Sequence, residues 1–344
     1  MAAASGLTFD EAVAFHRGIH VMDLHADTAK LMAKLGYDLA VRHERVLPRM
    51  FNAFGHVDLP RLREGGVAGQ FFSFWTIPKP ERGCHRGVTT QLDAMDGAID
   101  KHPAEIVWTR TGADVRAAKA AGKIAALGGI EGGQALESRL DAIETFSRRG
   151  VRYLGLLHLS DNALGRPTYG RNSDRDTGLT AFGRDAVREC ERCGVIVDLA
   201  HVNRRGFFDA IELATAPPIV SHAGVRGVHD HARNIDDEQI KAIADRGGVV
   251  GVIFAKKFLG GASVEAVVDH ILHVIDVAGE DVPALGSDFD GAVVPPDGLE
   301  DVAQLPNLTV ALSNRGVGPR VLEKILGANV LRVLDETPAW GRLS

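Results

Sequence analysis

The stretch GVIVDLAHVNRRGFFDAIELATAPPIVSH, residues 194–222, contains the repeating unit from which the fold of this chain can be inferred. GVIVDLAH (194–201) and PPIVSH (217–222) are short apolar runs typical of strands buried on both faces, and NRRGFFDAIELA between them has the pattern of an amphipathic helix. Strand, helix and strand in this order predict a βαβ unit with two parallel strands. Both predicted strands end on a histidine, His201 and His222.

The same alternation continues along the chain and predicts eight strands. They cover residues 19–25, 67–75, 123–131, 151–159, 194–201, 217–222, 247–254 and 282–288. Eight is the number of strands that closes a (β/α)8 barrel. A doubly wound open sheet is the alternative, but it usually carries a G-x-G-x-x-G turn, and GGIEGG (128–133) has a different spacing.

We therefore predict an α/β fold, a parallel eight-stranded (β/α)8 TIM barrel, formed by one domain over residues 1–344. The length alone, at about 150 residues per domain, would suggest two domains, but barrels commonly reach about 250 residues and grow by insertions. Two long βα loops, residues 32–60 and 160–178, account for the additional length. Loops of this size in a compact domain are more often functional than not.

Composition excludes several classes of protein. The net charge is −6, from 45 acidic and 39 basic residues, and no basic stripe indicates nucleic-acid binding. No run approaches 18 apolar residues, so we predict no transmembrane helix and no membrane partner. Three cysteines cannot form an even disulfide framework, and the N-terminus lacks the features of a signal peptide, which favours a reducing, cytoplasmic location. We interpret Cys190 and Cys193 as ordinary helix residues.

Ionisable residues end six of the eight predicted strands. They are His25 with Asp27, Glu131, His158, His201, His222 and Asp288. In a TIM barrel these strand ends meet on one face, where the active site lies. Burying several such groups together is costly unless a cation compensates them. Imidazole with carboxylate suits Zn²⁺ best, with Mn²⁺, Co²⁺ or Fe²⁺ possible, and three histidines with two carboxylates fit two ions bridged by a carboxylate.

Other polar residues leave alternatives open. Asp23 and Asp198 precede ligand histidines closely and would either support those rings or serve strand packing. His229 and His231 could border the site without binding metal. His270 and His273 lie on an amphipathic helix, where we expect surface or half-buried positions.

Several motifs together resemble the membrane dipeptidase (renal dipeptidase, peptidase M19) family of metal-dependent amidohydrolases. The resemblance extends over about residues 20–330, in the family's order. The matching motifs are DLHADT (23–28), GIEGG (129–133), YLGLLH (153–158), GLTAFGRDAVRE (178–189), VDLAHV (197–202), PIVSH (218–222), HARN (231–234), GGVVGV (247–252) and GSDFDG (286–291).

The resemblance implies a role for each site residue. His25 and Asp27 match ligands of one zinc, His201 and His222 match ligands of the other, and Glu131 matches the carboxylate that bridges two Zn²⁺ per chain. His158 matches a histidine that contacts substrate beside the scissile carbonyl. Arg233 matches the residue that binds the substrate's α-carboxylate, and Asp288 matches the acid/base for the metal-bridging hydroxide.

The implied function is hydrolysis of small dipeptides, including L-Xaa-D-Xaa, by a homodimeric dinuclear-zinc enzyme. Four residues depart from the family pattern. Leu157 stands where Thr is common, Ala223 where Ser is frequent, and Ile253 and Ala255 where many members have Asn and an aromatic residue. These departures leave open a related activity on another small amide, an N-acyl amino acid, a lactam or an ester. A non-catalytic metal-binding protein is the third alternative, disfavoured by Asp288 and the complete ligand set.

Overall fold

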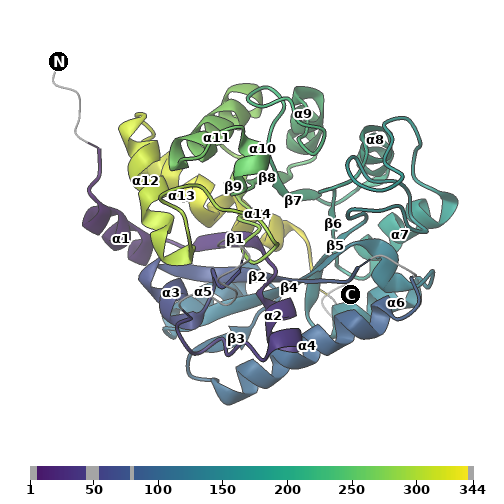
Figure 1. Ribbon diagram of the computed structural model, residues 1–344, viewed down its shortest axis with the longest axis horizontal. Helices are drawn as coiled ribbons and strands as arrows, with labels where there is room; N and C mark the ends of the chain where they lie inside the picture. Colours follow the sequence, from purple (N-terminus) through teal and green to yellow (C-terminus); the bar gives the residue numbers. More distant parts are fainter. Residues whose placement is uncertain (1–5, 44–53, 78–80, 340–344) are drawn as a thin grey trace.

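Nine parallel strands form one sheet, and eight of them close into a barrel (Figure 1). The structure, a computed structural model, describes residues 6–43, 54–77 and 81–339. The strands are β1 (Val21–Ala26), β2 (Val67–Trp75), β3 (Ile106–Trp108), β4 (Ile124–Glu131), β5 (Val151–Gly155), β6 (Ile196–Asp198), β7 (Ile219–Ala223), β8 (Val249–Val252) and β9 (Pro283–Leu285). Their order is β2-β1-β9-β8-β7-β6-β5-β4-β3, and pairing of β2 with β4 closes the barrel.

The predicted (β/α)8 barrel is therefore confirmed, with one strand that the sequence pattern did not indicate. β3 pairs with residues 124–126 of β4, on the edge that β5 occupies from residue 128 onward. Three residues between charged neighbours are too short to give a periodic signal. Most observed strands are also shorter than the apolar runs that predicted them, because the runs continue into the loops at the strand ends.

Helices lie between successive strands and cover the outside of the barrel (Figure 1). They are α1 (Phe9–Gly18), α2 (Thr28–Leu35), α3 (Leu59–Glu64), α4 (Cys84–Lys101), α5 (Gly112–Ala120), α6 (Asp141–Arg148), α7 (Ala181–Arg192), α8 (Arg204–Leu213), α9 (Asp237–Asp245), α10 (Lys256–Leu259), α11 (Val264–Ala278), α12 (Leu305–Asn314), α13 (Pro319–Glu323) and α14 (Asn329–Glu336). Short 3-10 helices cover Gly133–Leu136 and Val302–Gln304, and a π-helical turn covers Lys324–Ala328.

One local interpretation agrees with the structure and one prediction is wrong. Cys190 lies in α7 and Cys193 directly follows it, and both are buried free cysteines. Thr180 caps the same helix by accepting a hydrogen bond from the Gly183 N–H. His270 is not at the surface. It is completely buried, where it accepts a hydrogen bond from the Val225 N–H at 2.8 Å and contacts the Leu259 carbonyl oxygen at 3.1 Å. A periodic pattern cannot distinguish a histidine that binds backbone groups from one that faces solvent.

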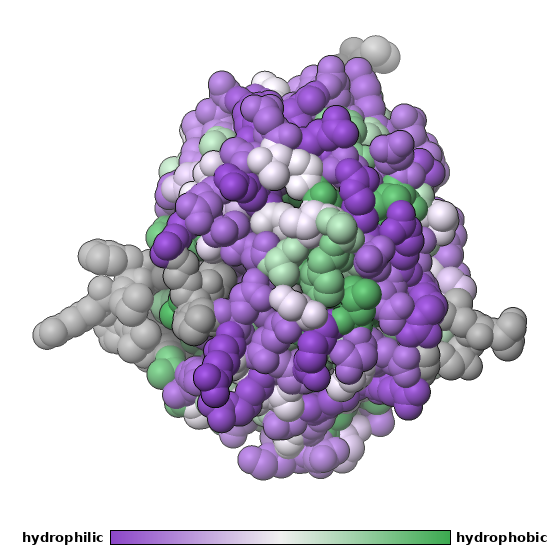
Figure 2. Space-filling view, turned by 90° about the vertical axis from the view of Figure 1, so that its right-hand side faces the viewer, coloured by the Kyte–Doolittle hydropathy of each residue, from purple (hydrophilic) through white to green (hydrophobic). Residues whose placement is uncertain are grey.

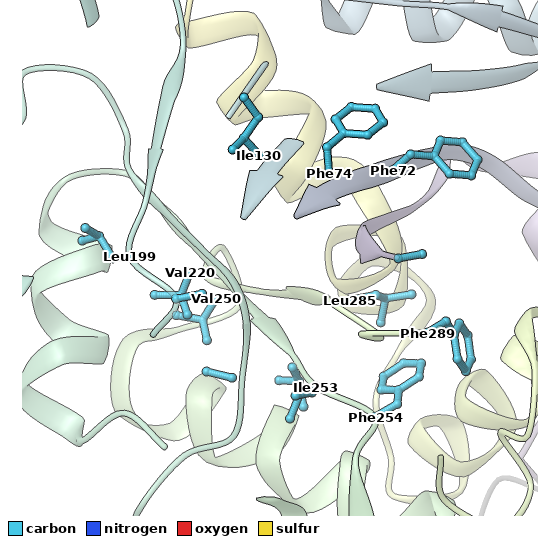
Figure 3. Packing of buried hydrophobic residues seen from close by; sticks show 14 of the residues in the cluster. Phe72, Phe74, Ile130, Leu199, Val220, Val250, Ile253, Phe254, Leu285 and Phe289 are labelled. Atoms are coloured by element: carbon cyan, nitrogen blue, oxygen red, sulfur yellow. The ribbon is translucent and has the colours of Figure 1, made fainter. Parts of the chain in front are cut away.

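Apolar side chains form two clusters, one on each side of the barrel wall. The inner cluster takes residues from all eight barrel strands, among them Met22, Phe71, Leu127 and Tyr153. The outer cluster packs the strands against the helices, as Figure 3 shows for Val220 beside Val250 and for Phe254. Because side chains alternate along a strand, Leu127 and Glu131 of β4 share the inner face. The strands thus deliver their last inward residue to the carboxyl end of the barrel.

The two long loops lie at that end. The first, 32–60, begins as the last turns of α2, and its residues 44–53 lie outside the described part of the chain. Among the described helices, none is both long and apolar enough to cross a membrane. The face shown in Figure 2 is mostly hydrophilic, with hydrophobic residues gathered near its centre.

Candidate metal centre and active site

The predicted site residues meet at the carboxyl ends of the barrel strands. Glu131 is the last residue of β4, and His222 lies within β7. His25 lies near the end of β1, and Asp27 follows at the start of α2. His158, His201 and Asp288 each lie three residues beyond a strand end. All seven side chains are buried.

Glu131 lies at the centre of the group. Its Oε1 is 3.0 Å from Nε2 of His201, 3.4 Å from Nε2 of His222, 3.5 Å from Nε2 of His158 and 4.0 Å from Nε2 of His25. The Nε2 atoms of His201 and His222 are themselves 3.0 Å apart. With metal–ligand bonds of about 2.0–2.1 Å, the ligands of a tetrahedral ion lie about 3.3 Å from one another. The spacing of these atoms therefore matches that expected around a shared ion.

Glu131 also belongs to a second group of possible ligands, together with His25 and Asp27. His25 Nε2 is 3.5 Å from Asp27 Oδ1, and both atoms lie within 4.8 Å of a Glu131 carboxylate oxygen. Neither His25 Nε2 nor Asp27 Oδ1 has a hydrogen-bond partner among the described residues, although both atoms are fully buried. Buried polar atoms normally have partners, so these two atoms fit a cation between them. Glu131 is common to both groups.

Burial gives the cluster a strong electrostatic cost. Burial raises the pKa of Glu131 well above its usual value and raises the pKa of Asp288 to about 8. It lowers the pKa of His158 to about 3. For His25 burial is the largest effect and also opposes the charged form, but the carboxylates of Asp27, Glu131 and Asp288 together outweigh it and raise the pKa to about 10. Carboxylates in this setting stay ionised only beside a compensating positive charge, which metal ions would supply.

Two ring nitrogens that face away from the centre are held by hydroxyl groups. His25 Nδ1 is 2.9 Å from Tyr153 Oη, and His222 Nδ1 is 2.9 Å from Ser221 Oγ. The Ser221 hydroxyl donates in turn to Asp198 at 2.7 Å. Such partners fix ligand histidines in the orientation that leaves Nε2 free. The roles of Tyr153 and Ser221 were not predicted from the sequence, although the position of Ser221 directly before His222 was an available signal.

Asp23 and Asp198 were expected either to support ligand histidines or to serve strand packing, and the structure shows a different role for each. Asp198 supports the His222 ring through Ser221. Asp23 contacts no ring: it accepts hydrogen bonds from the backbone N–H and the hydroxyl of Ser287 and from the Gln70 side chain. Asp23 therefore serves strand packing.

A cavity of about 370 Å³ opens onto the cluster. Its floor includes Glu131, Arg233 and Asp288, whereas its walls are mainly apolar or aromatic. The other lining residues are Asp27, Trp75, His158, Leu159, Tyr169, His201, Ala255, Lys257, Phe258, Gly291, Ala292, Val293 and Val294. Tyr169 comes from the predicted functional loop 160–178. Pockets of this size and character typically bind small molecules.

Arg233 is buried without a carboxylate partner. Its Nη2 donates to the His222 carbonyl oxygen at 2.8 Å, and it has no ion pair with any described residue. Burial lowers the pKa of this guanidinium. A planar, buried cation that lines a cavity is suited to a carboxylate of a ligand. His229 and His231 belong to neither group of possible ligands, and His231 Nδ1 instead accepts the Arg233 N–H at 3.0 Å.

Two of the clustered residues have left-handed backbone conformations. φ is 65° at His201 and 61° at Asp288. Non-glycine residues seldom adopt this conformation, and it concentrates at functional sites. The conformation turns each chain sharply just after a strand.

Sequence comparison identifies the family. The family model described as membrane dipeptidase (peptidase family M19) matches residues 9–342. The chain belongs to this family. It is accordingly a hydrolase of the metallo-dipeptidase class, and metal dependence follows from the family and from the candidate ligand clusters.

Individual relatives agree with this membership. Dipeptidase tcpJ from Claviceps purpurea (strain 20.1) is 36% identical over 295 residues, which cover 82% of this chain and 69% of that protein. Dipeptidase AC, a metallopeptidase of family M19, superposes with a TM-score of 0.84 at 30% identity, covering 94% of this chain and 99% of that one. A metallopeptidase from Rhodobacter sphaeroides, bound to a phosphinate mimic of L-Ala-D-Ala, gives 0.82 at 28% identity, covering 93% and 99%.

The four departures from the family pattern all belong to the outer apolar cluster. They are Leu157, Ala223, Ile253 and Ala255. Ala255 alone among them lines the cavity. Any effect of these departures on substrate choice by direct contact is therefore expected at Ala255.

Proposed function

We propose that this member of the family is a dinuclear-zinc dipeptidase that hydrolyses the peptide bond of small dipeptides, including L-Xaa-D-Xaa. The observation that carries the proposal is the position of Glu131, whose carboxylate is common to two groups of possible ligands. His25 and Asp27 would complete one zinc site, and His201 and His222 would complete the other. Three protein ligands for each ion leave a position open, as catalytic zinc sites require.

His222, rather than His158, is proposed as the third ligand of the second ion, although both Nε2 atoms lie within 3.5 Å of Glu131 Oε1. His222 Nδ1 is held by Ser221, as is usual for a metal-binding histidine, whereas the Nδ1 atoms of His158 and His201 have no partner among the described residues. The choice of His201 and His222 as the pair of ligands therefore follows the family resemblance, and the Ser221 contact supports it for His222. His158, which lines the cavity, would instead donate a hydrogen bond to the carbonyl oxygen of the substrate.

When bound, two zinc ions would supply an acidified water as nucleophile and positive charge beside the scissile carbonyl. The chain's own residues would orient the substrate and move the proton. Arg233 would bind the α-carboxylate of the dipeptide, which restricts the site to short substrates. Asp288 lies on the cavity floor, with Oδ1 3.8 Å from His25 Nε2, and would take a proton from the nucleophile and return it to the leaving amine.

The relatives support the choice of substrate. The Rhodobacter sphaeroides metallopeptidase binds a mimic of L-Ala-D-Ala, and the Claviceps purpurea relative is a dipeptidase. We further propose a homodimer, from the family resemblance, which light scattering at several concentrations would test.

The decisive experiment combines metal analysis with a substrate panel. We expect two zinc ions per chain and hydrolysis of dipeptides in a panel that varies the chirality of the C-terminal residue. Asp288→Asn should keep both metals and lose turnover. A metal-loaded enzyme that cleaves no dipeptide but hydrolyses an N-acyl amino acid, a lactam or an ester would replace the dipeptidase proposal with that activity.

A further inference from the structure

A second positive charge lies on the wall of the cavity, apart from Arg233. Lys257, in α10, lines the cavity and is exposed to solvent. Its Nζ is 3.1 Å from Tyr169 Oη and lies 5.2 Å from the centre of the Tyr169 ring and 5.7 Å from that of Phe258. No carboxylate of the described residues forms an ion pair with it. Its neighbour Lys256 differs, because it pairs with Asp297 and does not line the cavity.

Lys257 and Arg233 line the same cavity. His231 connects the two segments, since its Nδ1 accepts the backbone N–H of Arg233, and the centre of its ring lies 5.3 Å from that of Tyr169 and 5.0 Å from that of Phe258. The Lys257 charge also contributes to lowering the pKa of His231, after the larger effect of burial.

The loop that carries Tyr169 is fastened to the same segment. The Thr168 hydroxyl donates to the Ala232 carbonyl oxygen at 3.0 Å, one residue before Arg233. Lys257, Tyr169 and Phe258 therefore form a continuous wall beside the proposed carboxylate site. We call these three residues the Lys257 wall.

We propose that the Lys257 wall selects dipeptides whose C-terminal residue carries an acidic side chain, aspartate or glutamate. This inference rests on the proposed function, because it takes Arg233 to bind the α-carboxylate. Because Arg233 and the Lys257 wall line the same cavity, a C-terminal residue held by Arg233 would have its side chain within reach of that wall. No carboxylate in the part of the chain that the structure describes pairs with the Lys257 ammonium group, so a carboxylate of the substrate would not have to displace one of those.

The aromatic rings keep the amine directed along the wall. Tyr169 Oη can accept one N–H of the ammonium group, and the two ring faces attract its charge. Forming an ion pair normally costs the conformational entropy of a flexible lysine side chain. Because the aromatic rings already order Lys257, this cost is smaller here. The selection is one of charge, because the amide analogues glutamine and asparagine are nearly the same size as the acids.

The test compares matched substrates in matched variants. The ratio of kcat/KM for L-Ala-D-Glu to that for L-Ala-D-Gln, and the same ratio for the L-L pair, would be measured in the zinc-loaded wild type, in Lys257→Met and in Lys256→Met. Binding of phosphinate analogues of Ala-Glu and Ala-Gln, measured by calorimetry, gives a readout independent of turnover.

We expect the Glu/Gln ratio to exceed one in the wild type and to fall about two- to fivefold in Lys257→Met, the range of a partly exposed ion pair. Lys256→Met should leave the ratio unchanged, and raising the ionic strength should reduce the wild-type ratio. An unchanged ratio in Lys257→Met, with both dipeptides cleaved, would overturn this inference and leave the dipeptidase proposal intact. Cleavage of no dipeptide would overturn the proposed function and this inference with it.

Discussion

Replacing Ser221 with alanine removes the one hydroxyl that connects His222 to Asp198. In the wild type, His222 Nδ1 lies 2.9 Å from Ser221 Oγ, and the Ser221 hydroxyl donates to Asp198 Oδ2 at 2.7 Å. Asp198 Oδ1 also accepts the backbone N–H groups of Ala200 and Ser221, so the variant loses one of the contacts of Asp198 and keeps the others. The His222 ring loses its only partner on that side.

The expected effect has two parts. Removing the partner of a metal-binding histidine typically costs about 10- to 100-fold in metal affinity, or about 1.4–2.7 kcal/mol. The variant also leaves buried polar atoms unsatisfied, which should lower the free energy of unfolding of the metal-free protein by about 1–3 kcal/mol. We expect one zinc of the proposed pair to be lost at a chelator concentration that leaves the other bound.

Ser287→Ala is the matched control. Like the Ser221 hydroxyl, the Ser287 hydroxyl donates a hydrogen bond to a buried aspartate, Asp23, at 2.6 Å. It also contacts the His25 carbonyl oxygen, but it contacts no ligand ring. Both variants should lose similar stability without metal, measured by urea unfolding in chelator. Metal content after dialysis against graded chelator should change in Ser221→Ala alone. Equal metal affinity in the two variants would refute the role assigned to Ser221.

Three further predictions concern substrate binding, pH and packing. Arg233→Met removes charged hydrogen bonds worth about 2–3 kcal/mol and should lower kcat/KM for dipeptides about 30- to 150-fold. Dipeptide amides lack the α-carboxylate, so their kcat/KM should change far less. Equal losses for dipeptides and their amides would contradict carboxylate binding by Arg233. Burial lowers the pKa of His270 to about 4, below its unfolded value near 6.5. The unfolded chain therefore binds more protons in that interval, and this contribution to stability is complete above pH 6.5 and is lost as the pH falls toward 4. When the pH is lowered from 7 to 5, the free energy of unfolding measured with urea should fall by about 2 kcal/mol more in the wild type than in His270→Gln. The same fall in both proteins would contradict this role of His270. Gly129→Ala places Cβ 2.0 Å from Cζ of Tyr153, the residue that holds His25, so this variant should lower both the Tm and the metal affinity at His25. The control Gly97→Ala adds a methyl group with no described atom within 4 Å, and it should be neutral or stabilise the protein by up to about 1 kcal/mol.

The sequence allowed prediction of the barrel and of the residues that meet at its carboxyl end, because strand ends must converge once the strands are parallel. Glu131 and His222 illustrate this, since each ends an apolar run. Supports such as Tyr153 escaped prediction because they are defined by contact across the barrel: Tyr153 lies on β5 and reaches His25 on β1. Lys257 escaped prediction for the same reason, because its surroundings combine α10 with two separate loops, those of Tyr169 and His231.

At two places in the barrel, which we call seams, neighbouring strands share only one regularly paired position. Side-chain hydrogen bonds connect the strands at both seams. β1 and β9 share one paired position, and so do β6 and β7. At the first seam Asp23 accepts the N–H and the hydroxyl of Ser287, and at the second Asp198 accepts the N–H and the hydroxyl of Ser221. Hydrogen bonds to a buried carboxylate are each worth about 1.5–3 kcal/mol, so two of them replace the missing backbone pairs.

Four residues of the candidate site lie beside these two seams. His25 and Asp288 follow the first seam, and His201 and His222 follow the second. Regular pairing continued to the strand ends would hold these residues in extended conformation, but φ is 65° at His201 and 61° at Asp288. The aspartate–serine contacts hold the strands together while freeing the next residues to turn inward. The sparse strand pairing thus accompanies the turns at His201 and Asp288, and the hydrogen bonds of the two buried aspartates connect the strands at these positions.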